Sequence, residues 1–188
     1  MHLTLTPRAE YHRLELVGIT VLSSASELSK AGVGGCLQAF PTPALITGVA
    51  MGPVAVGVST GPPAAIEEWE DVIEVPVLLE GDSTVIGGTQ IAGVDVPWLG
   101  VPPGRHCMRV LSRGGDENYD LAVTEASQTI RIELVPFTGI EPRVLRLTSK
   151  RASAQTRVHD GLGLHTGGEE GAISDEEANL RRVSREHP

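Results

Sequence analysis

The sequence is poor in aromatic residues, which make up 3% of its 188 positions. A hydrophobic core must therefore be built mainly from Val, Ile, Leu and Ala. The 22 glycines and 13 prolines suit short strands and many turns better than a helical bundle. These proportions predict an all-β, mainly antiparallel fold, and we expect a β-sandwich of about 7–9 short strands.

Basic residues are also scarce, because 15 Lys and Arg stand against 24 Asp and Glu, giving a formal net charge of -9. Nucleic-acid binding depends on clustered Lys and Arg that neutralise phosphates, so this charge argues against a nucleic-acid partner. An acidic protein is suited to a basic protein partner, whose approach its charge would steer. The same charge also serves solubility alone.

Metal and thiol motifs are missing. The two cysteines, Cys36 and Cys107, stand in apolar stretches and form no Cys-x-x-Cys pair. We expect both to be small buried hydrophobic residues, and the sequence leaves open whether they pair. The six histidines show no His-x-x-x-His or His-Glu-x-x-His spacing, so we expect no metal and no cofactor.

Long apolar runs and targeting signals are absent as well. The apolar segment from Val33 to Val58 is interrupted by Pro41, Pro43 and Pro53, which makes it a poor membrane helix. The first residues contain no basic stretch followed by an apolar run and a small-residue cleavage site. We therefore expect a cytoplasmic protein without a membrane segment.

Catalytic motifs are missing too. Residues 32–35 are glycine-rich but lack the Gly-x-x-x-x-Gly-Lys-Ser/Thr pattern of a phosphate loop. Ser59 does not have the Gly-x-Ser-x-Gly spacing of a nucleophile elbow. The sequence therefore nominates no catalytic residue, and it favours a protein that is not an enzyme without deciding the question.

Alternating apolar and polar residues predict the strands, and the cleanest are Val72–Leu79, Arg105–Arg113 and Thr129–Phe137. Shorter patterns predict further strands around residues 13–17, 44–50, 53–59, 84–90 and 144–147. We expect 44–50 to form a hairpin with 53–59, and 72–79 one with 84–90. Pro76 has no N–H for a sheet, which predicts an edge or a bulge there. Antiparallel pairing of the last two long strands would bring Arg109 opposite Glu133.

The composition changes after Lys150, where Gly, Ser, Glu and Arg dominate and no aromatic residue occurs. Such a segment offers too little apolar surface to offset the entropy of ordering it. We therefore predict a β-domain over residues 1–150 and a disordered polar tail over 151–188.

The most distinctive charged segment is residues 62–75, PPAAIEEWEDVIEV. If Pro62 opens one or two helical turns, Glu67, Glu70, Asp71 and loosely Glu74 fall on one face. Trp69 then lies on the opposite face as an anchor, and its indole N–H needs a partner. A solvated acidic turn is the simplest interpretation. A cation site, a general acid–base pair and a docking surface for a basic protein are the functional alternatives.

A family resemblance extends over about half of the chain. It is carried by residues 68–75 (EWEDVIEV), by Gly104 leading into Met108-Arg109-Val110, by residues 130–136 (IRIELVP) and by Arg143 to Ser149. These features resemble a group of actinobacterial β-domain proteins and, more distantly, the ComJ-like nuclease-inhibitor group. The resemblance implies a β-sandwich without established catalytic residues. Its ComJ-like part implies an inhibitor or immunity-type protein that binds a protein partner.

Three hypotheses of function follow from the sequence. The first is a non-enzymatic protein-binding module that uses an acidic surface formed by residues Glu67, Glu68, Trp69, Glu70, Asp71 and Glu74. The second is a small-ligand-binding protein or small enzyme, with a pocket between the sheets lined by His106 and Arg109. The third is a structural subunit that self-associates through an edge strand near Pro76, since the oligomeric state is open.

Overall fold

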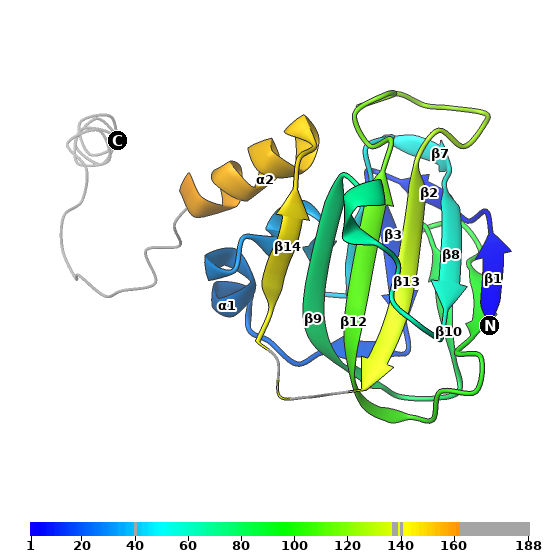
Figure 1. Cartoon of the computed structure of the whole chain (residues 1–188). Coiled ribbons are helices and arrows are strands. Elements are labelled where there is room, and N and C mark those ends of the chain that lie inside the picture. The colour runs from blue at the N-terminus through cyan, green and yellow to red at the C-terminus, as the bar shows by residue number, and fades with distance from the viewer. Residues whose placement is uncertain (40, 137–138, 140, 162–188) are drawn as a thin grey trace, which may run out of the picture.

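Two β-sheets stacked face to face form the body of the protein in the computed structural model (Figure 1). The structure describes residues 1–39, 41–136, 139 and 141–161. Each sheet has seven strands, and nearly all neighbouring strands run antiparallel. The predicted fold class, an all-β sandwich, is therefore confirmed, with more and shorter strands than expected.

The first sheet, called sheet A here, has the strand order β1-β8-β13-β12-β9-β14, with β4 also paired to β9. Its strands are β1 (His2–Leu5), β4 (Ile19–Val21), β8 (Ala55–Ser59), β9 (Asp71–Leu79), β12 (Gly104–Arg113), β13 (Thr129–Pro136) and β14 (Arg143–Leu147). The three long strands β9, β12 and β13 are those with the clearest alternation in the sequence. They form the centre of the sheet.

Sheet B has the order β11-β10-β3-β2-β7, with β6 paired to both β3 and β5. Its strands are β2 (Arg8–Glu10), β3 (Arg13–Val17), β5 (Leu37–Gln38), β6 (Ala44–Ile46), β7 (Met51–Pro53), β10 (Ser83–Gly87) and β11 (Val94–Pro97). Most of these strands are too short to show two full periods of alternation, which explains why several were not predicted.

The helices are α1 (Ala25–Lys30), η1 (Val33–Gly35), η2 (Ile66–Glu68) and α2 (Lys150–Gly161). Helix α1 begins with a capping box, in which Ser24 accepts the N–H of Glu27 and the Glu27 carboxylate accepts the N–H of Ser24. The helix α2 packs beside η1 at the β14 side of the sandwich (Figure 1). A Cβ at Gly35 would overlap the Ala152 backbone, so glycine permits this close approach.

The core between the sheets is aliphatic, as the composition predicts. Val, Ile and Leu side chains from both sheets fill it, and Trp98 is its one fully buried aromatic residue among those described. A second, smaller cluster of Trp69, Val72 and Leu111 covers the outer face of sheet A. The central strand β9 is therefore buried on both of its faces, although it belongs to a mainly antiparallel sheet.

Two predicted hairpins are wrong, because the chain changes sheets where the sequence predicts a turn. The 44–46 strand lies in sheet B, whereas β8 lies in sheet A. Similarly, β9 belongs to sheet A and β10 to sheet B. Both connections have the glycine-rich composition of a hairpin turn, so composition alone does not distinguish a turn within a sheet from a crossing between sheets. The antiparallel pairing of β12 with β13 is confirmed.

Pro76 is neither on an edge strand nor at a bulge of the register. It lies within β9, which has β12 on one side and both β14 and β4 on the other. Pro76 lies between the part of β9 that pairs with β14 and the part that pairs with β4. Its carbonyl accepts the N–H of Leu22, just beyond β4. Because no strand pairs with β9 at this point on that side, the missing N–H of proline costs no strand-to-strand hydrogen bond. The edge on which the self-association hypothesis depended is therefore occupied by other strands.

The ordered structure continues past Lys150, where we expected the domain to end. The α2 side chains of Arg151 and Ala152 are buried, and Ala152 belongs to the main core. Residues 162–188 of the predicted tail lie outside the described residues. Among the described helices, none is long and apolar enough to span a membrane.

Both cysteines are free and buried, which confirms the prediction of small core residues. Burial raises the pKa of the Cys36 thiol to about 12. The negative charge of Asp71 raises this pKa further, and Arg151 acts to lower it. Burial likewise raises the pKa of Cys107 to about 11. Because the thiolate is the reactive species, both thiols are chemically inert in the folded protein.

We therefore expect a chromogenic thiol reagent at about pH 8 to label neither cysteine in the native protein, because that pH lies well below both pKa values. In denaturant both should react within minutes. Absorbance of the released chromophore measures the outcome. Rapid labelling of one native thiol would contradict the burial described here, and mass spectrometry of the labelled peptide would identify which one.

Candidate functional site

The acidic segment forms one short 3₁₀ turn, Ile66–Glu68, rather than the two helical turns predicted from Pro62. The chain is already extended at Trp69, so the residues after it follow a strand with period two. The predicted single acidic face is therefore wrong. Glu67 and Glu68 are exposed, whereas Asp71 and Glu74 are buried.

Trp69 anchors the segment, as the sequence predicts. Its ring packs on Val72 and Leu111 at the outer face of sheet A, and the guanidinium carbon of Arg113 lies 5.1 Å from the ring centroid. The indole N–H, for which we predicted a partner, has none among the described residues. This packing holds the 3₁₀ turn against the sheet, so Glu67 and Glu68 are carried on a well-supported backbone.

Glu70 joins the acidic segment to the loop that follows β12. Its carboxylate accepts the N–H of Gly114 at 3.0 Å. Its backbone also bonds on both sides, donating to Ser112 and accepting from Thr148. Glu70 is half-buried, and these hydrogen bonds leave its side chain little freedom to contact a partner protein.

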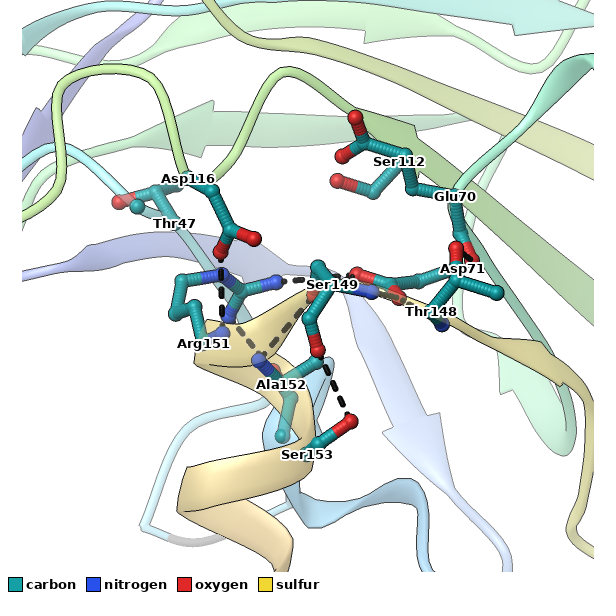
Figure 2. A network of polar contacts seen from close by, with 12 residues as sticks. Thr47, Glu70, Asp71, Ser112, Asp116, Thr148, Ser149, Arg151, Ala152 and Ser153 are labelled. Atoms are coloured by element: carbon teal, nitrogen blue, oxygen red, sulfur yellow. Dashed lines mark hydrogen bonds and ion pairs between the residues drawn. The ribbon is translucent and has the colours of Figure 1, made fainter.

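Asp71 is the centre of a buried polar network at the start of α2 (Figure 2). Its carboxylate accepts the Ser149 hydroxyl at 2.6 Å and the backbone N–H groups of Thr148 and Ser149 at 3.1 and 3.0 Å. A guanidinium nitrogen of Arg151 lies 3.5 Å from the same carboxylate and another donates to the Gly35 carbonyl at 2.7 Å. The buried carboxylate is thus surrounded by donors, as a buried charge requires.

The network fastens α2 to the sandwich. Ser149 caps the helix by accepting the N–H of Ala152, and Asp116 accepts the N–H groups of Lys150 and Arg151 from the opposite side. Figure 2 shows Ser149 directed toward Asp71 at this helix start. Ser149 is 2% exposed, so its hydroxyl is closed to a substrate, and the arrangement is structural.

Glu74 lies in a second network, a row of alternating charges across the outer face of sheet A. From β14 to β13 the row consists of Arg143, Glu74, Arg109, Glu133 and Arg131. One Glu74 oxygen accepts from Arg143 at 2.6 Å and the other from Arg109 at 2.5 Å. The register places Arg109 opposite both Glu74 and Glu133, which confirms the predicted pairing across β12 and β13.

The middle of the row, Glu74, Arg109 and Glu133, is largely buried, whereas Arg143 at the β14 end has 52% of its side chain exposed. The connection from β8 to η2 crosses this face (Figure 1), and the N–H of Ala64 donates to Glu133 at 2.9 Å. Burial acts to raise the pKa of Glu74, but hydrogen bonds from Arg109 and Arg143, together with their charges, outweigh it and lower that pKa below its ordinary value. Glu74 is therefore ionised and paired, and it contributes no free charge to the surface.

His106 and Arg109 cannot line one pocket between the sheets. They are three residues apart on β12, so their side chains lie on opposite faces of sheet A. His106 is on the face of Met108 and bonds to the Pro102 carbonyl at 2.9 Å, whereas Arg109 joins the outer charged row. A hollow of about 260 Å³ lies elsewhere, between α1 and residues Glu141 and Pro142. The small-ligand hypothesis therefore loses its proposed site.

No metal centre is found in the described part of the chain, where no group of three or more His, Cys, Asp and Glu side chains could hold an ion. The carboxylates of Asp71 and Glu74 are already occupied by N–H, hydroxyl and guanidinium donors. Neither has a free oxygen face to offer a cation.

Comparison with known proteins gives a distant similarity in fold. No protein-family model matches the chain, and no curated protein matches it. Among solved structures, ComJ from Bacillus subtilis, an inhibitor of the DNA-degrading activity of NucA, is similar at 10% identity and a TM-score of 0.43, covering 73% of this chain and 99% of ComJ. Crocagin biosynthetic gene J is similar at 17% identity and a TM-score of 0.39, covering 71% and 96% of the two chains. The ComJ-like and the actinobacterial resemblances of the sequence both stay predictions.

We predict that the Glu74→Ala protein loses about 3 kcal/mol of unfolding free energy, because Arg109 would keep a buried charge without its main partner. Urea unfolding followed by circular dichroism measures the loss. The exposed Glu67→Ala change is the matched control and should alter stability by less than about 0.5 kcal/mol. Equal losses for both variants would show that the charged row does not stabilise the fold.

The lowered pKa of Glu74 also predicts an acid dependence. A carboxylate with a lowered pKa in the folded state stabilises the protein above its unfolded pKa of about 4.3, and this contribution disappears as pH falls toward the folded value. Between about pH 7 and about pH 3, the wild type should therefore lose more stability than Glu74→Gln, which cannot titrate. Parallel stability curves for the two proteins would refute this.

Proposed function

We propose that this protein is a non-enzymatic binding module that captures a basic partner protein through an acidic surface at residues Glu67 and Glu68. The observation that carries the proposal is that both side chains are exposed and that neither takes part in an ion pair among the described residues. Unpaired surface carboxylates attract a basic partner and orient its approach.

The restrained backbone that carries Glu67 and Glu68 favours recognition of a partner protein. Trp69, which follows them, is buried on the sheet, and its N–H donates to the Ile66 carbonyl at 3.1 Å, so the backbone of the turn that carries Glu67 and Glu68 is restrained. A restrained surface loses little entropy when a partner binds. Asp71 and Glu74, which the sequence predicts on the same surface, are buried structural residues and take no part in it.

An inhibitor or immunity-type protein is one form of such a module, since it blocks a partner by covering it and needs no reacting groups. Inhibition of a nuclease is the function stated for ComJ. For this chain the identity of the partner is what the following experiment must establish.

We predict that the double variant Glu67→Lys/Glu68→Lys loses at least about tenfold in affinity for its partner, because reversing two charges turns attraction into repulsion. Affinity capture from an extract of the producing organism, quantified by mass spectrometry against the wild type, identifies the proteins that the variant no longer retains. Titration of one such purified protein by calorimetry then gives the affinity.

The matched control is Asp82→Lys/Asp95→Lys, which makes the same charge change at two exposed positions, one just before β10 and one within β11. It should retain the partner at near wild-type affinity. If both doubles lose the same proteins, the effect follows from net charge alone. If no protein is retained by the wild type and control but lost by Glu67→Lys/Glu68→Lys, the proposed surface is wrong.

A further inference from the structure

Both tyrosines of the chain are exposed on one surface, while both tryptophans are buried. Tyr11 is 68% and Tyr119 is 49% exposed, and Met51 at 42% and Leu121 at 54% accompany them. Exposed large apolar side chains are common singly but mark interaction sites when they gather. In a chain with so few aromatic residues, this concentration needs an explanation.

Hydrogen bonds join the segments that carry these residues into one surface. His12, next to Tyr11, donates its backbone N–H to Ala50 at 3.1 Å, and Asp120 donates its own to Gly48 at 2.9 Å. The carbonyl of Leu121 accepts the N–H of Ala50 at 2.9 Å. We name the combination of residues 11–12, 47–52 and 119–123 the tyrosine surface.

A ring contact and hydrogen bonds of His12 hold the middle of the tyrosine surface. The imidazole of His12 lies 5.6 Å from the Tyr119 ring, and its Nε2 is 3.0 Å from the Asp120 carboxylate. The other ring nitrogen of His12 is 3.2 Å from the Thr47 carbonyl. These contacts fix the loop carrying Tyr119 against the turn that carries Tyr11.

The turn itself is unfavourable for the residues that occupy it. Tyr11 and His12 link β2 to β3 as a two-residue turn with φ values of 49° and 63°, a conformation that favours Asn-Gly. Asp120 also has a positive φ, of 62°. Three of the four non-glycine residues with positive φ in the described chain thus belong to the tyrosine surface. His and Asp are enriched at positive φ, so Tyr11 is the unusual residue of the three, and such outliers point to a functional role.

The loop that carries Tyr119 is acidic, whereas Arg13, next to the turn that carries Tyr11, pairs with Glu15. The loop of residues 114–128 contains Asp116, Glu117, Asp120 and Glu125 and neither Lys nor Arg, and residues 47–52 carry no charge. Asp116 caps α2, but Glu117 and Glu125 are exposed and take part in no described ion pair. A partner complementary to this surface must therefore present basic side chains around apolar ones.

We propose that the tyrosine surface is a second binding site, specific for a protein segment in which Arg or Lys alternates with large apolar residues, with Tyr11 and Tyr119 as its anchors. Tyrosine is enriched among the residues that dominate binding energy, because it buries a large ring with little loss of side-chain entropy. The tyrosine surface shares no residue with Glu67 and Glu68, so variants can test the two surfaces independently.

The test uses a synthetic peptide of alternating arginine and leucine, with two comparison peptides that replace either arginine by glutamate or leucine by serine. Backbone amide NMR of the full chain should show shifts at residues 11–12, 50–51 and 119–121 for the arginine–leucine peptide alone. Calorimetry should show about tenfold weaker binding to the Tyr119→Ser protein, and to Tyr11→Asn.

Tyr11→Asn keeps the test decisive, because asparagine is preferred at this positive φ and should leave the thermal midpoint unchanged or raised. Weaker binding without loss of stability then reports a lost contact. The control Val94→Ser removes an exposed apolar side chain on β11 and should not change binding.

Four results would overturn the proposal. Equal binding of the arginine–serine peptide would show that charge alone is recognised, and unchanged affinity of both tyrosine variants would exclude the anchors. Shifts confined to residues 67–68 would support the acidic surface of the proposed function instead. If light scattering shows a dimer of the wild type that the Tyr11→Asn change dissociates, the tyrosine surface binds a second copy of this chain.

Discussion

The burial of β9 on both faces is the constraint from which the rest of the arrangement follows. Asp71 and Glu74 lie on this strand, and a carboxylate removed from water must be neutralised by donors or by opposite charge. Asp71 meets this requirement through the start of α2, and Glu74 through arginines on both neighbouring strands. The attachment of the helix and the register of the central strands thus both satisfy charges on β9.

The register of sheet A could be predicted in part because the charges alternate along the strands. Arg109 and Glu133 occupy corresponding positions in two clear period-two patterns, and antiparallel pairing brings them together. Glu74 belongs to an equally clear pattern, but its partner Arg143 is 69 residues away on a strand with a register shift. Nothing local in the sequence indicates which of several arginines a distant strand will supply.

The buried position of Asp71 was harder to predict for a different reason. The spacing of Glu67, Glu70, Asp71 and Glu74 fits one face of a helix and not one face of a strand, so periodicity alone favours the helix there. Tertiary packing decides between them, because Val72 and Leu111 offer Trp69 a surface only when the chain is extended from that point. Arg151 falls where composition predicts a tail and Ser149 lies just before it, after the last predicted strand, so their role in the network leaves no local signal.

The distribution of the rare aromatic residues separates stability from recognition in this protein. A fold whose core is made of Val, Ile and Leu does not need tyrosine for packing, and the two tryptophans fill the places where a large ring is buried. Selection for stability alone would favour Asn-Gly in the turn at residues 11–12, since both residues there have positive φ. A strained tyrosine that projects into solvent contributes neither core packing nor a better turn. Its retention is understandable if it contacts another molecule, as residues that lower stability commonly do at binding sites.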